Sequence, residues 1–207
     1  DGPGATSLAV GGNFPLSPGG DGLLAAWQRC GQREDFCFGN GGTGGCTPCP
    51  CGNDAAPGTV GGCLNSVARS ARLLASGSNQ ATAGDLRFEA RGMTPTGFGM
   101  LASGSGTLPG MGPCPSGSGI PSQVFDGLRC LGAGFMRHGT RSVDALGEIG
   151  GTTPGWGPPD GPAGGVAQEF GFSAGQTRFF QLIYRDDPAQ VCGRGLNTTN
   201  GVRVLFW

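Results

Sequence analysis

The stretch "TRFFQLIYRD", residues 177–186, decides the fold class that the sequence predicts. Its middle, "FFQLIY", is apolar at almost every position, so an extended segment here has two apolar faces. A short apolar run that is rich in aromatic residues and is bounded by turn residues is typical of a central β-strand covered on both sides. We therefore predict an all-β protein with this segment inside a sheet.

Further strands are predicted on both sides of this segment along the chain. Residues 85–92, "DLRFEARG", alternate apolar and charged side chains, as in a strand with one buried face. In 201–207, "GVRVLFW", apolar side chains recur at every second position of "VRVLF". Similar short runs occupy 71–77, 97–104, 126–139 and 165–172. The whole set predicts an antiparallel β-sandwich or jelly-roll-like fold, with at most one short helix, at 22–29.

Composition and charge exclude several classes of protein. Glycine supplies 45 of the 207 residues without a collagen-like repeat, which favours many turns between strands. The 13 basic residues are all arginine and are balanced by 14 acidic residues, so the chain offers no electrostatic attraction for nucleic acid. The absence of lysine excludes a phosphate-loop or Schiff-base lysine. No run reaches the ~20 apolar residues of a transmembrane helix.

The segment "CTPCPCGN", residues 46–53, lies in a cluster that holds six of the nine cysteines between residues 30 and 63. So many cysteines favour an oxidising compartment, and hence secretion. Cys49 and Cys51 are two residues apart and are expected to bond to different partners. The connectivity stays open, with a bond from Cys130 to either Cys192 or Cys114 among the alternatives. The predicted members of the disulfide framework are Cys30, Cys37, Cys46, Cys49, Cys51, Cys63, Cys130 and Cys192.

Two metals stay open as alternatives at this stage. The spacing of Cys46, Cys49, Cys51 and Cys63 fits a four-cysteine zinc site, although an oxidising compartment opposes free thiolates. Calcium prefers oxygen ligands, which the loops "GNDAAPG" and "DDPAQVCGRGLNTTN" contain in number. We predict no required cofactor and keep calcium as the candidate ion.

The chain is divided by its composition into three segments that are expected to form one compact unit. Residues 1–20 are predicted to be an extended arm, 21–66 a cysteine-rich loop segment, and 67–207 the β-sandwich. Leu8 and Val10 share one face of the arm. We hypothesise that these two residues insert into a neighbouring subunit as an added strand, and that this head-to-tail contact builds a filament.

Candidate catalytic residues are few. His138 is the only histidine, and no G-x-S-x-G motif accompanies it, so we predict no enzymatic activity. A hydrolase of unrecognised type is the weakest alternative. Trp156 lies in a Gly-Pro loop, where an exposed ring would stack on a sugar, and it supports the alternative of a carbohydrate-binding module.

Several motifs appear in a fixed order: "FCFGNG", "CPCGN", "GC.NS", "ARL.ASG", "DGLRC", "YRD" and "C..G.N.TNG..V". Over residues 36–207 this order resembles an uncharacterised glycine-rich module that recurs in secreted bacterial proteins, planctomycete ones in particular. Residues 1–35, Cys30, Cys46 and Cys114 lie outside the shared pattern. The resemblance implies secretion and a surface role, and it implies no activity. We therefore expect a secreted structural or adhesive protein whose partner is another copy of itself or a surface glycan.

Overall fold

The computed structural model describes residues 33–207 except 42–45, 112–116, 162–163 and 190–191. By its internal contacts the chain divides into residues 1–31 and residues 32–207, and the description below concerns the second unit. Leu8, Val10, Cys30, Cys114 and the helix predicted at 22–29 lie outside the described residues.

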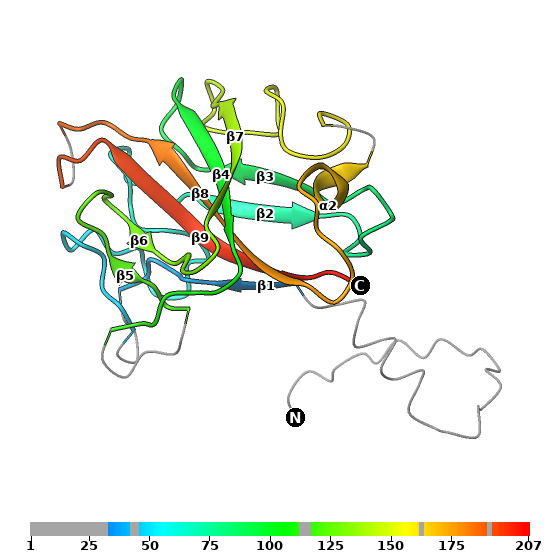
Figure 1. Ribbon diagram of the computed structural model, residues 1–207. Coiled ribbons are helices and arrows are strands. Elements are labelled where there is room, and N and C mark those ends of the chain that lie inside the picture. The colour runs from blue at the N-terminus through cyan, green and yellow to red at the C-terminus, as the bar shows by residue number, and fades with distance from the viewer. Residues whose placement is uncertain (1–32, 42–45, 112–116, 162–163, 190–191) are drawn as a thin grey trace, which may run out of the picture. The chain divides into compact units, whose positions relative to one another are not determined.

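The main element is a five-stranded antiparallel sheet (Figure 1). Its order across the sheet is β1 (Arg33–Phe36), β9 (Leu196–Leu205), β8 (Thr177–Arg185), β4 (Phe98–Gly104) and β7 (Met136–Ser142). The strand β8 lies in the centre, which confirms the prediction made from "FFQLIY". The strand β1 belongs to the segment that was expected to form only loops, yet it pairs with β9 along its full length.

A second layer packs on the inner face of this sheet. It is the antiparallel pair β2 (Arg72–Ser76) and β3 (Arg87–Arg91). Leu86 and Phe88 are buried, as their alternation with charged residues predicts. They join Leu101, Leu182 and Val204 of the large sheet in one hydrophobic core. The protein is therefore a mostly β, two-layered antiparallel structure.

The short helix α2 (Gly165–Glu169) replaces the strand predicted at 165–172. Gly165 has a φ of +60°, and a Cβ there would lie 2.6 Å from the backbone of Gly84. The chain is thus turned out of an extended path at a point that only glycine tolerates. Val166 and Ala167 then enter the core from the helix. In the described residues, no helix is long and apolar enough to cross a membrane.

Within the described residues, three disulfides hold the cysteine-rich segment against the outer face of the sheet, next to the short hairpin β5 (Ile120–Pro121) and β6 (Leu128–Arg129). Cys49 and Cys51 have different partners, as expected, and neither bond proposed between the three later cysteines forms. The oxidised sulfurs also exclude the four-cysteine zinc site. Disulfides in this number indicate folding in an oxidising environment. The bonded pairs are Cys37–Cys130, Cys49–Cys63 and Cys51–Cys192.

Among the described cysteines, one predicted member of this framework is not bonded. Cys46 carries a free thiol and is partly exposed, which corrects the expectation that it forms a disulfide. The cysteines closest to it in sequence, Cys49 and Cys51, are already bonded to Cys63 and Cys192. An odd total of cysteines leaves at least one without a partner inside the chain.

Close approach of the backbone explains some of the glycines of this segment. A Cβ at Gly39 would lie 2.1 Å from the backbone nitrogen of Cys63. A Cβ at Gly62 would lie 1.9 Å from the carbonyl oxygen of Thr198 in β9. Only glycine lets these loops lie so close to each other and to the sheet.

Candidate binding groove

The outer face of the large sheet has a covered half and an open half. Over the covered half, the side chain of Gln181 donates to the carbonyl oxygen of Leu128 at 2.9 Å and accepts from the backbone N–H of Cys130 at 3.2 Å. Cys130 is bonded to Cys37, so the disulfide-linked segment covers the sheet at this point. Two residues further along β8, Ile183 faces the same way and lines an open surface hollow. The end of the cover therefore marks the edge of a groove.

The groove consists of two adjoining hollows of about 230 and 370 Å³. Both are lined by Val124, Phe125, Phe135 and Ile183, so they form one continuous surface feature. Leu131 extends this apolar lining at one end, and Phe98, Met100 and Leu196 extend it at the other. Phe98 and Val124 are 54% and 61% exposed. The groove is thus an apolar surface left open to solvent.

A fixed turn builds one wall of the groove. The hydroxyl of Ser122 accepts hydrogen bonds from the backbone N–H groups of Val124 and Phe125, at 3.0 and 3.3 Å. Just after them, the N–H of Asp126 donates to the carbonyl oxygen of Leu196 at 2.7 Å, which fastens the turn to the start of β9. The apolar side chains of this wall are held in place by the backbone rather than by a partner.

The strands under the groove are irregular. The pairing of β4 with β7 shifts register between Met100 and Ala102, and the pairing of β8 with β9 shifts between Gln181 and Ile183. Such β-bulges increase the local twist of a sheet and are frequent at binding sites. Here Met100 and Ile183 each lie at one end of a register shift, and the extra residue lies on the partner strand, β7 or β9.

Arginines without partners line the groove. Arg129 lines one hollow, and Arg137 and Arg185 line the other. All three are exposed, and no ion pair, side-chain hydrogen bond or ring contact engages their guanidinium groups within the described residues. Of the other described arginines, only Arg194 also lacks such a contact. The groove therefore combines an apolar floor with concentrated positive charge.

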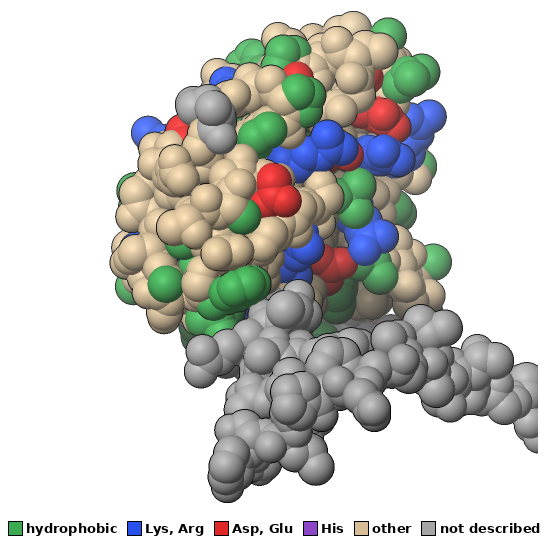
Figure 2. Space-filling model, turned by 90° about the vertical axis from the view of Figure 1, so that its right-hand side faces the viewer, with side chains coloured by type: hydrophobic (Ala, Val, Ile, Leu, Met, Phe, Trp, Pro, Cys, Tyr) green, Lys and Arg blue, Asp and Glu red, His purple; other side chains and the backbone are tan. Residues whose placement is uncertain are grey.

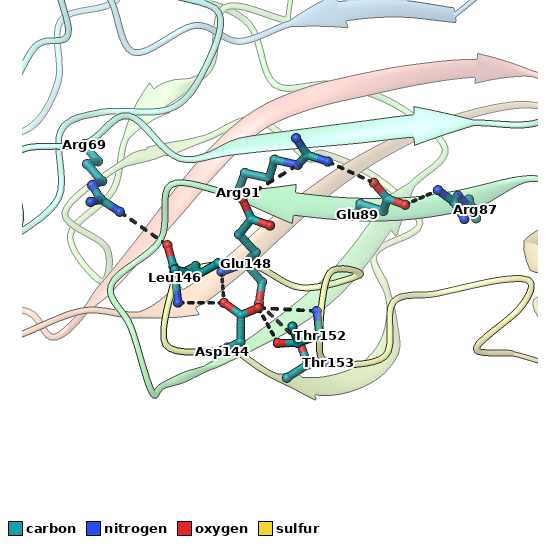
Figure 3. Close-up of polar contacts among 9 residues, drawn as sticks. All are labelled: Arg69, Arg87, Glu89, Arg91, Asp144, Leu146, Glu148, Thr152 and Thr153. Carbon is teal, nitrogen blue, oxygen red and sulfur yellow. Dashed lines mark hydrogen bonds and ion pairs between the residues drawn. The ribbon is translucent and has the colours of Figure 1, made fainter.

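A second surface of the molecule shows the opposite arrangement. Figure 2 shows arginines lying beside acidic side chains on the face turned toward the viewer. In Figure 3, Glu89 of β3 forms ion pairs with Arg87 and Arg91, and Arg91 also reaches Glu148 at 4.0 Å. We call these four residues the paired surface. Its positive charges are neutralised within the protein.

The loop beside the paired surface is organised by Asp144 (Figure 3). Its carboxylate accepts from the hydroxyl of Thr152 at 2.7 Å and from the backbone N–H groups of Leu146 and Glu148 at 2.9 Å. These bonds, that from Thr152 foremost, hold the pKa of Asp144 below its usual value. Asp144 therefore has a structural role in its own loop.

The structure brings His138 to a serine but buries the pair. The ring of His138 lies 2.7 Å from the hydroxyl of Ser103 and stacks on Phe170. His138 is 6% exposed and Ser103 is fully buried. Burial, followed by the charge of Arg178, lowers the pKa of His138 to about 4. Neither group is accessible to a substrate, so this pair does not form a nucleophilic site.

Trp156 lies in the core, which corrects the expectation of an exposed ring for sugar binding. Its backbone pairs with Phe88 through hydrogen bonds of 2.8 and 3.1 Å, and its indole N–H donates to the carbonyl oxygen of His138 at 2.9 Å. The side chain is completely buried. The flanking glycines and prolines suggested a free loop, but the loop is paired to β3 at this residue.

The two loops considered for calcium meet at a shared carbonyl oxygen. They contact it through amide N–H donors, whereas calcium would need oxygen ligands. The side-chain amides of Asn53 and Asn197 both donate to the carbonyl oxygen of Leu64, at 2.7 and 3.2 Å. The same Asn197 amide group donates to Asp186 at 3.4 Å. Within the described part of the chain, no three side chains of His, Cys, Asp or Glu form a group that could hold a metal ion.

Comparison of the chain with family models, with curated proteins and with solved structures finds no match.

The groove was not predicted from the sequence, although the sequence contains a signal for it. In β4 and β8 the outward positions Phe98, Met100 and Ile183 are apolar like the inward ones. That pattern predicts a cover on both faces, and the sequence does not show that the cover ends at Gln181.

Proposed function

We propose that this protein is a secreted, non-catalytic structural or adhesive protein that attaches to an extracellular partner through the groove. The observation that carries the proposal is an apolar groove that stays open in a disulfide-linked protein and is lined by arginines without partners. Exposed apolar patches rimmed by polar residues often mark interaction sites on soluble proteins. Exposed arginines beside aromatic side chains are also frequent at interfaces.

Two further observations support an extracellular role. The three disulfides are of the kind that persists outside the cytoplasm. The ordered motifs between residues 36 and 207 resemble those of secreted bacterial modules. A non-catalytic role is supported by the burial of His138 and Ser103, because the single histidine would have to serve any Ser-His mechanism.

The test is retention of the purified protein on extracellular material of its source organism. We expect Phe98→Ser combined with Phe135→Ser to abolish retention, because both exposed rings line the groove. The matched control is Leu146→Ser combined with Val67→Ser, which removes exposed apolar side chains outside the groove. Equal retention of both double variants would rule out the groove as the attachment site.

A second candidate is self-assembly through residues 1–20, with Leu8 and Val10 inserted into another copy. The observation that favours it is an available acceptor, since β7 is an edge strand of the described sheet and lies beside the groove. Deleting residues 1–18 is expected to convert filaments into monomers in size-exclusion chromatography and electron microscopy. A full-length protein that is monomeric at high concentration would contradict this candidate.

A further inference from the structure

We propose that the groove binds an extended peptide segment of a partner protein in which acidic residues alternate with apolar ones. This inference rests on the proposed function, because it names the partner chemistry of the same groove. It is carried by three properties of the lining residues: the apolar chemistry of the floor, the distribution of the arginines, and the small number of uncharged polar groups that are free to bind hydroxyls.

The floor suits apolar side chains. Phe125, Phe135 and Ile183 are shared by the two hollows, and further apolar side chains continue the floor at each end. Desolvation of such surface by leucine or phenylalanine side chains is the main favourable contribution in most peptide complexes. Register shifts occur in the strand pairs at Met100 and Ile183, and such shifts increase the local twist of a sheet.

The arginines are distributed along the groove. Arg129 lines the hollow next to the covered half, whereas Arg137 and Arg185 line the hollow at the other end. A ligand with one charged head and one apolar tail would engage only one of these ends. A peptide with several carboxylates along its length can reach all three guanidinium groups, whose planar donors match a carboxylate well.

The backbone next to Arg185 is fixed by the buried side chain of the following residue. The next residue, Asp186, is buried and accepts a hydrogen bond from the hydroxyl of Thr94 at 2.7 Å. It also accepts from the hydroxyl and the backbone N–H of Ser66. These bonds fix the end of β8, so that a side chain on the groove face starts from a rigid backbone.

The lining suits a polysaccharide less well. Sugars are recognised largely through hydrogen bonds to their hydroxyl groups, yet the polar lining residues are already engaged. Gln181 is bonded to Leu128, Cys130 and Thr199, and the Ser122 hydroxyl accepts from two backbone N–H groups. Thr140 and Tyr184 supply the other hydroxyls of the described lining, and that of Tyr184 is buried in the protein.

The experiment measures binding of fluorescent peptides to the full chain by polarisation. The probe is a peptide of about ten residues with alternating glutamate and leucine or phenylalanine, and its counterpart carries lysine in place of glutamate. We expect the glutamate peptide to bind and the lysine peptide not to bind. Raising the salt concentration should weaken binding, because exposed charges are screened.

Two double variants locate the site. Arg137→Ala with Arg185→Ala is expected to weaken binding of the glutamate peptide by about tenfold or more, because it removes two of the three lining charges. The control, Arg87→Ala with Arg203→Ala, removes two arginines that are ion-paired elsewhere. It should change the affinity by less than about twofold. Thermal unfolding of both proteins checks that they remain folded.

The outcomes separate this inference from the proposed function. The peptide inference is wrong if polygalacturonate binds while the glutamate peptide does not, or if a peptide of residues 1–20 of this chain binds more tightly. It is also wrong if both double variants bind the glutamate peptide equally. If groove variants lose retention on extracellular material while no acidic peptide binds, the adhesive function stands and the peptide class falls. If neither readout depends on the groove, both proposals fail.

Discussion

The arginines of the paired surface and the arginines of the groove lie on the same small protein in opposite surroundings. On β3, Arg87 and Arg91 share the carboxylate of Glu89. Around the groove, Arg137 and Arg185 have no acidic neighbour within ion-pair distance in the described chain. The protein contains almost equal numbers of acidic and basic residues. A shortage of acidic residues therefore does not explain why the groove arginines lack ion-pair partners. The placement of acids separates a surface that stabilises the fold from one that is available to a partner.

The largest loss of stability is expected when the disulfide-linked cover over one half of the sheet is loosened. Cys37→Ser with Cys130→Ser removes the bond that ties the end of β1 to the segment above Gln181. The free energy of unfolding, measured with urea, is expected to fall by about 2–5 kcal/mol. Because the cover loosens, binding at the groove should weaken as well, while the paired surface on β3 keeps its ion pairs.

The free thiol supplies the control for that experiment. Cys46→Ser should leave the urea midpoint unchanged, because Cys46 forms no disulfide. An equal loss of stability in both proteins would show that Cys46 takes part in the framework.

A smaller effect on stability is expected from acid. Arg137 and His138 are neighbours on β7, but Arg137 is exposed at the groove and His138 is buried. The folded-state pKa of His138 lies near 4, below its usual 6.5. As pH falls through this window, the unfolded chain binds a proton that the folded chain does not, so stability decreases. The expected loss is up to about 3 kcal/mol between pH 6.5 and 4.

Denaturation at a series of pH values tests this assignment. In the wild-type protein, His138 should contribute a slope to the plot of unfolding free energy against pH between pH 6.5 and 4. In His138→Gln this contribution should disappear, because glutamine does not titrate. An unchanged slope would assign the acid sensitivity to other groups.

On the paired surface, Glu89→Gln should cost about 0.5–1 kcal/mol of stability. Glu89 is the shared partner of two arginines, and its side chain is only 16% exposed. Its ion pairs should therefore contribute near the upper end of the stability range that is usual for surface ion pairs. Binding at the groove should be unaffected. A variant as stable as the original chain would show that the paired surface contributes nothing measurable.

The smallest effect on stability is expected at the groove itself. Arg137→Ala with Arg185→Ala should change the free energy of unfolding by no more than about 0.5 kcal/mol, because no partner is lost. A loss as large as that of Glu89→Gln would mean that these arginines have structural partners, and the contrast between the two surfaces would not hold.

The sequence predicted the strands well because their pattern is local. The run "FFQLIY" in β8 and the alternation around Phe88 in β3 each report burial within a few residues. The residues 165–172 were mistaken for a strand because a short apolar run fits a strand and a buried helical turn equally well. Gly165 decides between them through its contact with Gly84, far away in the sequence.

The sequence could not predict the groove or the disulfide pairs, because both depend on distant segments. The bonds Cys37–Cys130 and Cys51–Cys192 join residues 93 and 141 positions apart. The exposure of Phe98 depends on where the disulfide-linked cover stops. Trp156 was placed outside because its loop is rich in glycine and proline, whereas its pairing with Phe88 buries it.

The pairing of β1 with β9 has a consequence for biosynthesis. β1 is among the first described residues to emerge from the ribosome, yet its partner is complete only when Leu205 has been made. Folds dominated by such distant contacts assemble slowly. Meanwhile Cys37 and Cys51 wait for Cys130 and Cys192, with other thiols close by along the chain. Oxidation in order of emergence would join the wrong cysteines, so we expect a disulfide isomerase to raise the yield of native protein.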